Sequence, residues 1–149
     1  MNDYIYFSIK DEVTSINFTV TDYEYNYEYD FDKNIDVATK TNVLKCYYNY
    51  SDNDGCGSVE DTVPSEDISE FATLFANLIN NKRNELKIEK RLFVCEVKRT
   101  RTNYHIDFKI GDGLTGTWIQ VVKENMSKAE VEILANAVIS WAKAFPIPN

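Results

Sequence analysis

The sequence offers one candidate acid–base pair, His105 and Asp107. His105 is the only histidine of the chain, and Asp107 follows it by two positions in the segment YHIDF. Residues two apart share a face of a strand, so the imidazole and the carboxylate would be neighbours, as acid–base catalysis requires. No nucleophile stands beside them, and one histidine without a cysteine cluster makes a poor metal site. We therefore predict a structural or exposed histidine with no catalytic role.

The segment YSDNDGCGSVED (50–61) partly resembles a calcium-binding loop. Asp52, Asp54 and Gly55 match the third, fifth and sixth positions of an EF-hand loop. However, a tyrosine stands at the first ligand position, an aspartate replaces the final bidentate glutamate, and a strand pattern precedes the loop. We predict a turn rich in Asp and Gly over residues 51–64, and we expect no metal or other cofactor.

Three cysteines are scattered along the chain. Cys46 and Cys95 lie in strand patterns, which predicts buried and inert thiols. Cys56 stands between two glycines in a predicted loop and is expected to be exposed, without a basic neighbour in sequence to lower its pKa. An odd, scattered set of cysteines is typical of free thiols in a reducing cytosol.

Two further segments resemble anion sites. GDGLTG (111–116) is glycine-rich, but it joins two predicted strands, whereas phosphate-binding loops open a helix. We predict a hairpin loop there. KRTRTN (98–103) places three cations at a predicted hairpin tip, which would either contact an anion or remain solvated.

An acidic, aromatic segment, TDYEYNYEYDFDKN (21–34), alternates with period two. This alternation predicts a half-buried strand, with the tyrosines and Phe31 mostly facing the interior. Glu24, Glu28, Asp30 and Asp32 would face water and form a partner-binding surface. The alternative is that this acidic face confers only solubility.

Charge is unevenly distributed along the chain, which has a net charge of −8. Residues 1–70 hold 16 acidic and 4 basic side chains, whereas residues 71–149 hold 8 acidic and 12 basic ones. An acidic half repels phosphates and anionic lipid and attracts basic proteins. We therefore expect a basic protein partner, no nucleic acid and no membrane. The sequence shows no apolar run of membrane-spanning length and no secretory signal, so we expect a cytoplasmic protein.

The spacing of apolar residues predicts the strands and helices that position these side chains. Predicted strands cover 4–9, 13–20, the acidic segment, one or two strands within 34–50, and then 91–98, 104–110 and 117–122. Strands in consecutive runs, and not in βαβ alternation, indicate an antiparallel α+β domain over residues 1–149, with about six to eight strands in strands–helix–strands–helix order. The halves share this order but no residue-level repeat, which leaves a duplication open.

Two amphipathic helices are predicted. The first runs from about Glu66 to Asn80, capped by Ser65, and the second runs from about Lys128 to Phe145. In the second, Ser127 and a glutamate three residues later form a capping box, and prolines stop the helix. Both apolar stripes should pack against antiparallel sheet.

The order of elements resembles the immunity proteins of WapA-type polymorphic toxins of Bacillus-like bacteria. In that family a tyrosine follows an apolar strand, an Asp/Asn pair introduces the next strand, and Phe-Pro follows the last helix. Tyr23, Asp32, Asn34, Phe145 and Pro146 hold those places here. Departures are Ile35, where a tryptophan is common, and Ile147-Pro148, where a basic residue is common.

This resemblance implies a cytosolic, non-catalytic protein that neutralises a toxin domain, often a nuclease, by binding it. We adopt that expectation, and the sequence does not indicate an oligomeric state. One alternative is a small-molecule-binding or enzymatic domain with a pocket near His105 and Asp107. Another is a structural or assembly protein, which would show a large apolar patch.

Overall fold

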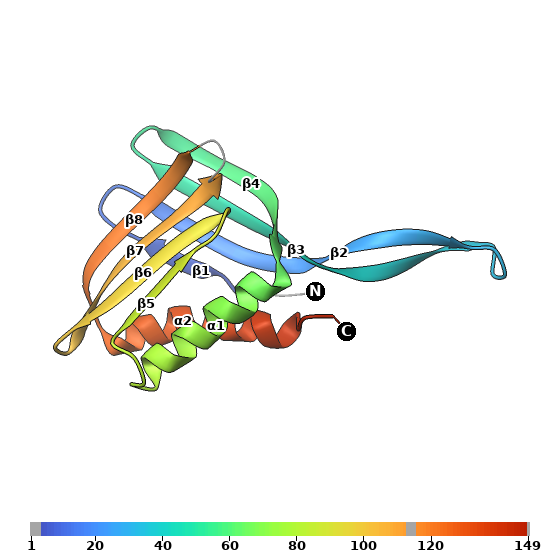
Figure 1. Ribbon diagram of the computed structural model, residues 1–149. Coiled ribbons are helices and arrows are strands. Elements are labelled where there is room, and N and C mark those ends of the chain that lie inside the picture. The colour runs from blue at the N-terminus through green and yellow to red at the C-terminus, as the bar shows by residue number, and fades with distance from the viewer. Residues whose placement is uncertain (1–3, 113–115, 149) are drawn as a thin grey trace.

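The computed structural model, which describes residues 4–112 and 116–148, consists of two four-stranded meanders, each followed by a helix (Figure 1). The first unit comprises β1 (Phe7–Lys10), β2 (Ser15–Asp30), β3 (Ile35–Asp52), β4 (Gly55–Pro64) and α1 (Ser65–Ile79). The second comprises β5 (Glu85–Glu89), β6 (Phe93–Thr100), β7 (Asn103–Asp112), β8 (Thr117–Met126) and α2 (Lys128–Ala144). Each sheet is antiparallel, with its strands in sequence order, which confirms the predicted α+β class and element order.

The core lies where the two sheets and the two helices meet. We call β1–β4 the N-sheet and β5–β8 the C-sheet. Phe7 of the N-sheet contacts Phe108 of the C-sheet with ring centroids 4.7 Å apart. The helices add Phe71, which stacks on Phe93 at 4.9 Å, and Trp141, whose ring meets Phe18 edge-on at 5.3 Å. Each of these rings is almost fully buried, and burial of one such side chain stabilises the fold by about 1.5–3 kcal/mol.

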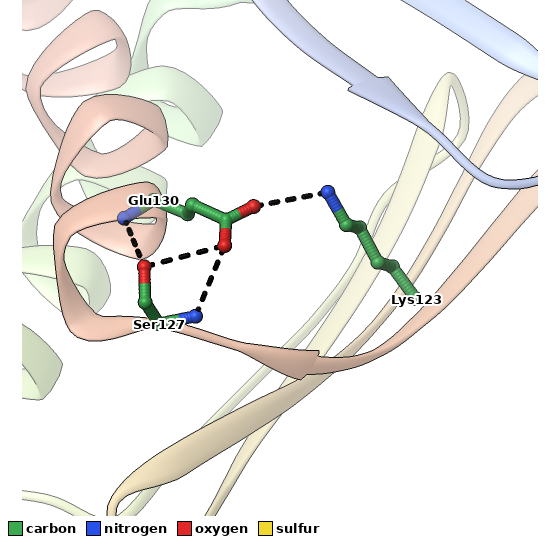
Figure 2. Close-up of polar contacts among 3 residues, drawn as sticks. All are labelled: Lys123, Ser127 and Glu130. Carbon is green, nitrogen blue, oxygen red and sulfur yellow. Dashed lines mark hydrogen bonds and ion pairs between the residues drawn. The ribbon is translucent and has the colours of Figure 1, made fainter.

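The two helices begin differently. Helix α2 has the predicted capping box, in which the Ser127 Oγ accepts the backbone N–H of Glu130 and the Glu130 carboxylate accepts the backbone N–H of Ser127 (Figure 2). The predicted cap of α1 is wrong. Pro64 holds the N-cap position without a side-chain cap, and Ser65 begins the helix with its Oγ donating to the carbonyl of Asn42. The Ser65 side chain is therefore hydrogen-bonded to β3 and does not cap its own helix.

The predicted turn over residues 51–64 is also wrong, because most of this segment forms β4. Only the step from Asp52 to Gly55 is a turn, in which the Asp52 carboxylate accepts the backbone N–H of Asp54 at 2.8 Å. Strand β4 then pairs with β3 along its whole length. The backbone pairing with β3 therefore makes this segment a strand, although its composition favours a turn. Strand β5, which was not predicted, buries two alternate side chains through the same kind of pairing.

The outer parts of β2 and β3 form a two-stranded ribbon that leaves the body of the molecule (Figure 1). We call residues 24–41 the arm. The prediction that its aromatic side chains mostly face the interior is wrong. Tyr27 is 70% exposed, Tyr29 45% and Phe31 86%, because the strands extend past the sheets and helices that would cover them. Only Tyr23, at the root of the ribbon, is buried, and Tyr25 is half-buried.

Candidate nucleic-acid interface

The predicted acid–base pair lies on the outer face of the C-sheet. His105 Nδ1 is 3.8 Å from a carboxylate oxygen of Glu124, and the Asp107 carboxylate accepts a hydrogen bond from Gln120 at 2.8 Å. Each side chain thus pairs with a neighbour on β8, and His105 is 35% exposed, which confirms a histidine at the surface. Neither residue lines the groove described below.

The four predicted partner-binding residues divide into two pairs. Glu24 and Glu28 are exposed on the arm, as expected. Asp30 is partly buried at the arm's tip, where its carboxylate accepts the backbone N–H groups of Asp32 at 3.0 Å and Lys33 at 3.2 Å. Asp30 therefore closes the tip turn, and Asp32 is exposed within that turn.

The cysteines lie as predicted. Cys46 and Cys95 are buried and Cys56 is exposed. Burial raises the pKa of the Cys46 thiol to about 12, and it raises the pKa of Cys95 well above its ordinary value. Among residues 4–112 and 116–148, no three His, Cys, Asp or Glu side chains are placed to hold a metal ion. The predicted loop at 111–116 falls partly outside the described residues, and the strands flanking it pair antiparallel.

A groove of about 670 Å³ crosses the outer face of the N-sheet, away from the core. It exists because the strands alternate: Phe7 and Phe18 point into the core, while the residues beside them point outward. The groove is lined by Tyr4, Tyr6, Thr19, Thr21, Lys45, Cys46, Tyr47, Glu60, Asp61 and Thr62. The sequence alone does not indicate this site, because its residues come from four separate segments that only the strand register brings together.

Two tyrosines at the start of the chain form one wall of the groove. Tyr4 is 50% exposed and Tyr6 is 40% exposed. They flank Ile5, whose carbonyl accepts hydrogen bonds from the Thr19 hydroxyl at 2.6 Å and the Trp141 indole at 2.9 Å. These two bonds hold the segment against β2 and α2, so the two aromatic side chains are presented from a fixed backbone.

The charges in the groove nearly cancel. Lys45 is exposed and forms no ion pair with any residue that the structure describes. Arg91 lies 3.1 Å from the Asp61 carboxylate, which leaves Glu60 to balance Lys45. The Tyr47 hydroxyl donates to Ser58 and orients that ring. The groove therefore combines aromatic rings, hydroxyl groups and one accessible cation.

A cluster of five exposed cations lies elsewhere, at the loop between α1 and β5 and at the β6–β7 turn. We call it the basic end; it comprises Lys82, Arg83, Lys98, Arg99 and Arg101. Arg99 joins its two segments, since its guanidinium donates to the Asn81 side chain at 3.1 Å and its backbone N–H donates to Asn84 at 2.8 Å. The cations of KRTRTN thus belong to a larger basic surface, which residues remote in sequence complete.

The fold is similar to solved structures of plant proteins. The crystal structure of WHY1 from Arabidopsis thaliana superposes with a TM-score of 0.54 at 12% identity, over 99% of this chain and 87% of that one. WHY3 from the same plant gives 0.50 at 13% identity, over 95% and 88%. The plant transcriptional regulator PBF-2 gives 0.48 at 11% identity, over 100% and 92%. No protein-family model and no curated protein matches the chain significantly.

These comparisons contradict the expected toxin-neutralising function. Of these, the structures that superpose with a TM-score of 0.50 or more are WHY1 and WHY3, and neither is an immunity protein. The exclusion of nucleic acid as a partner and the expectation of a basic toxin partner are withdrawn together with that function. The exclusion rested on charge summed over residues 1–70, whereas local charge decides binding. Five of those acidic side chains lie on the arm, while the basic end gathers five cations, of which Lys98 lies 3.0 Å from the Glu96 carboxylate.

No helix among residues 4–112 and 116–148 is both long enough and apolar enough to cross a membrane.

Proposed function

We propose that this protein binds single-stranded nucleic acid through the groove of the N-sheet, without catalysing a reaction. The observation that carries the proposal is the pair of half-exposed rings, Tyr4 and Tyr6, held beside the accessible Lys45 on the open face of an antiparallel sheet. Aromatic side chains on such a face stack against unpaired bases, and a nearby cation contacts the backbone phosphate.

The chemistry of the groove favours single strands over duplexes. Stacking on Tyr4 or Tyr6 requires a base whose face is free, and the bases of a duplex already stack on one another. Duplex binding rests mainly on many phosphate contacts, for which a groove with one accessible cation, Lys45, beside Glu60 and Asp61 is poorly suited. The hydroxyl oxygens of Thr21 and Tyr47, which donate to the Lys45 carbonyl and to Ser58, add acceptors for base edges.

We propose binding and not catalysis, because His105 and Asp107 contact neighbours on β8 and lie outside the groove. We also place the protein in a reducing compartment, in keeping with three free cysteines, and propose the cytosol. The similarity to WHY1 and WHY3 establishes architecture alone, so the proposal depends on the groove itself.

The test is fluorescence anisotropy with a labelled oligothymidylate and with a duplex of matched length. Wild-type protein should bind the single strand more tightly than the duplex. Tyr6→Ala should weaken single-strand binding by roughly 5- to 150-fold, the equivalent of about 1–3 kcal/mol for one stacked base. Tyr27→Ala, which removes an equally large exposed ring from the arm, is the matched control and should change affinity less than twofold.

Salt dependence separates the groove from the basic end. If Lys45 provides the main phosphate contact, log K should fall with log salt with a slope of about −0.7, and Lys45→Ala should remove most of it. If the slope is instead several times steeper, and if Arg99→Ala and Arg101→Ala make it shallower, then the nucleic-acid strand binds at the basic end. That result, equal binding of duplex, or full affinity in Tyr6→Ala would refute the groove as the site.

A further inference from the structure

The arm carries an aromatic face that nothing in the described part of the chain covers. Tyr27 and Phe31 are mostly exposed, and Tyr29 and Phe31 meet edge-on with ring centroids 4.8 Å apart. An isolated two-stranded ribbon is only marginally stable in water. Exposed aromatic side chains gathered on one such ribbon are typical of an interaction surface. The nucleic-acid groove does not include these residues.

Strand register defines the chemistry of this face. Tyr25 lies opposite Lys40, Tyr27 opposite Ala38, and Tyr29 opposite Asp36. Directly opposed side chains of an antiparallel pair point to the same face. Along β3, the aromatic face therefore carries a cation, a small residue and an anion at equal spacing. Most of the arm's acidic side chains, including Glu28, lie on the opposite face.

This arrangement is complementary to itself. A two-fold axis through the Tyr27–Ala38 pair would place Lys40 of one copy against Asp36 of a second copy, and the reverse pair would form at the same time. On this axis the Tyr27 rings of the two copies face each other, and the small side chains of Ala38 beside them leave room for the two rings. A two-fold contact of this kind is the commonest way in which identical chains associate. We propose that two copies of this protein dimerise through their arms, aromatic face to aromatic face.

Other occupants fit this face less well. The arm as a whole holds five acidic side chains and two lysines between residues 24 and 41, and this net negative charge disfavours the approach of nucleic acid to either face. The basic end of a second copy would complement the carboxylates but would leave the rings exposed. An aromatic residue buries about 150–250 Å² at most, so three rings per copy fall short of the roughly 800 Å² that a standard interface buries on each partner. The dimer is therefore reversible, with a dissociation constant of roughly micromolar or weaker.

Sedimentation velocity over a series from low micromolar to submillimolar protein tests the proposal. Wild-type chain should shift from monomer to dimer with concentration, and a Tyr27→Ser, Phe31→Ser double variant should remain monomeric. Circular dichroism checks that the body stays folded, as expected because both side chains lie outside the core. A wild-type chain that stays monomeric throughout, or a double variant that dimerises equally well, would overturn the proposal.

A charge-exchange series tests the two-fold geometry itself. Asp36→Lys alone and Lys40→Glu alone each place like charges together twice per dimer, and each should weaken association about tenfold. The combined variant restores opposite charges and should recover wild-type association. Failure of the combined variant to recover would refute the two-fold pairing. If the Arg99→Glu, Arg101→Glu double variant no longer associates, the arm of one copy instead binds the basic end of another. If the wild-type protein is monomeric and Tyr27→Ala weakens its binding to the oligonucleotide, the arm binds nucleic acid and not a second copy.

Discussion

The hydroxyl of Tyr23 donates a hydrogen bond to the carbonyl of Pro146, joining the root of the arm to the segment that follows α2. The Tyr23 ring also meets Phe145 edge-on at 5.5 Å, and Lys40 Nζ lies 4.7 Å from the centroid of the ring. Tyr23, at the root of the arm, therefore makes contacts with the segment after α2 and with Lys40. Two register shifts in the β2–β3 ladder, at Val20/Asp22 and Tyr23/Tyr25, flank it and allow the ribbon to change direction there.

Tyr23→Phe should lower the free energy of unfolding by about 1 kcal/mol, because it removes one hydrogen bond and leaves the Pro146 carbonyl without this donor. Urea denaturation followed by circular dichroism measures the change. Tyr27→Phe removes a hydroxyl from an exposed ring of the same strand and should cost less than about 0.5 kcal/mol. Equal effects in the two variants would show that the contact does not anchor the arm.

The helices could be predicted from the sequence because their signals are local. The apolar stripes of α1 and α2 recur at helical spacing, and the Ser127–Glu130 capping box is contained within four residues. The apolar stripes face the core, with Ile68, Phe71 and Phe75 of α1 and Leu134, Val138 and Trp141 of α2 buried in it. Ser65 shows the limit of such signals, since the hydroxyl that was assigned to a cap instead bonds Asn42 on another strand.

The arm and β4 could not be predicted, because both depend on what lies beside a strand. Alternation in residues 21–34 identifies a strand with two distinct faces, but it does not say whether another layer covers either face. The composition of β4 favours a turn, and only its long ladder with β3 makes it a strand. The groove has the same origin, since Tyr6, Thr21 and Lys45 are neighbours only through register.

Glu130 links α2 to β8, since its carboxylate lies 3.0 Å from Lys123 Nζ while accepting the Ser127 backbone N–H (Figure 2). The hydrogen bond from Lys123, followed by that of Ser127, holds the pKa of Glu130 below its ordinary value. Because this pKa is lowered on folding, the stabilisation is present above the unfolded-state pKa and is lost as pH falls through the folded-state pKa.

Glu130→Gln should therefore lower the free energy of unfolding at neutral pH by roughly 0.5 kcal/mol, a value reduced by the solvent exposure of the ion pair. The difference from wild type should shrink on acidification through the carboxylate titration. Urea melts at several pH values check both points, with Glu132→Gln on the same helix as control. A difference that is independent of pH would contradict the assignment.

Asp11 joins the β1–β2 turn to the C-sheet. Its carboxylate accepts the backbone N–H groups of Val13, Thr14 and, from β8, Val122 at 3.2 Å. Desolvation raises the pKa of Asp11, but the three backbone hydrogen bonds together outweigh it and lower the pKa. Asp11→Ala should lower the free energy of unfolding by about 1–2 kcal/mol at neutral pH. The loss should diminish as pH falls through the folded-state pKa.

The matched control is Glu12→Ala, which removes an exposed carboxylate one residue away and should change stability by less than about 0.5 kcal/mol. Urea denaturation at neutral and acid pH compares the two variants. If both carboxylates prove equally dispensable, Asp11 does not connect the sheets energetically.

The thiols should differ sharply in reactivity. An aromatic disulfide reagent should modify Cys56 in the folded protein, whereas Cys46 and Cys95 should react only after unfolding, because burial raises the pKa of both thiols and excludes the reagent. Peptide mass spectrometry of briefly treated protein identifies the modified residue. The Cys56→Ser variant should show no fast-reacting thiol, and rapid labelling of Cys95 would reveal an opening of the core.

The meander order of both sheets has a consequence for how the chain folds. Every strand pairs with its neighbour in sequence, so each ladder grows from a hairpin that closes a short loop at small entropic cost. The hydrogen bond from Trp141 to Ile5 instead spans 136 residues and closes nearly the whole chain. Folding should therefore begin independently in the two halves, and the contact that fixes the tyrosine wall of the groove should be among the last to form.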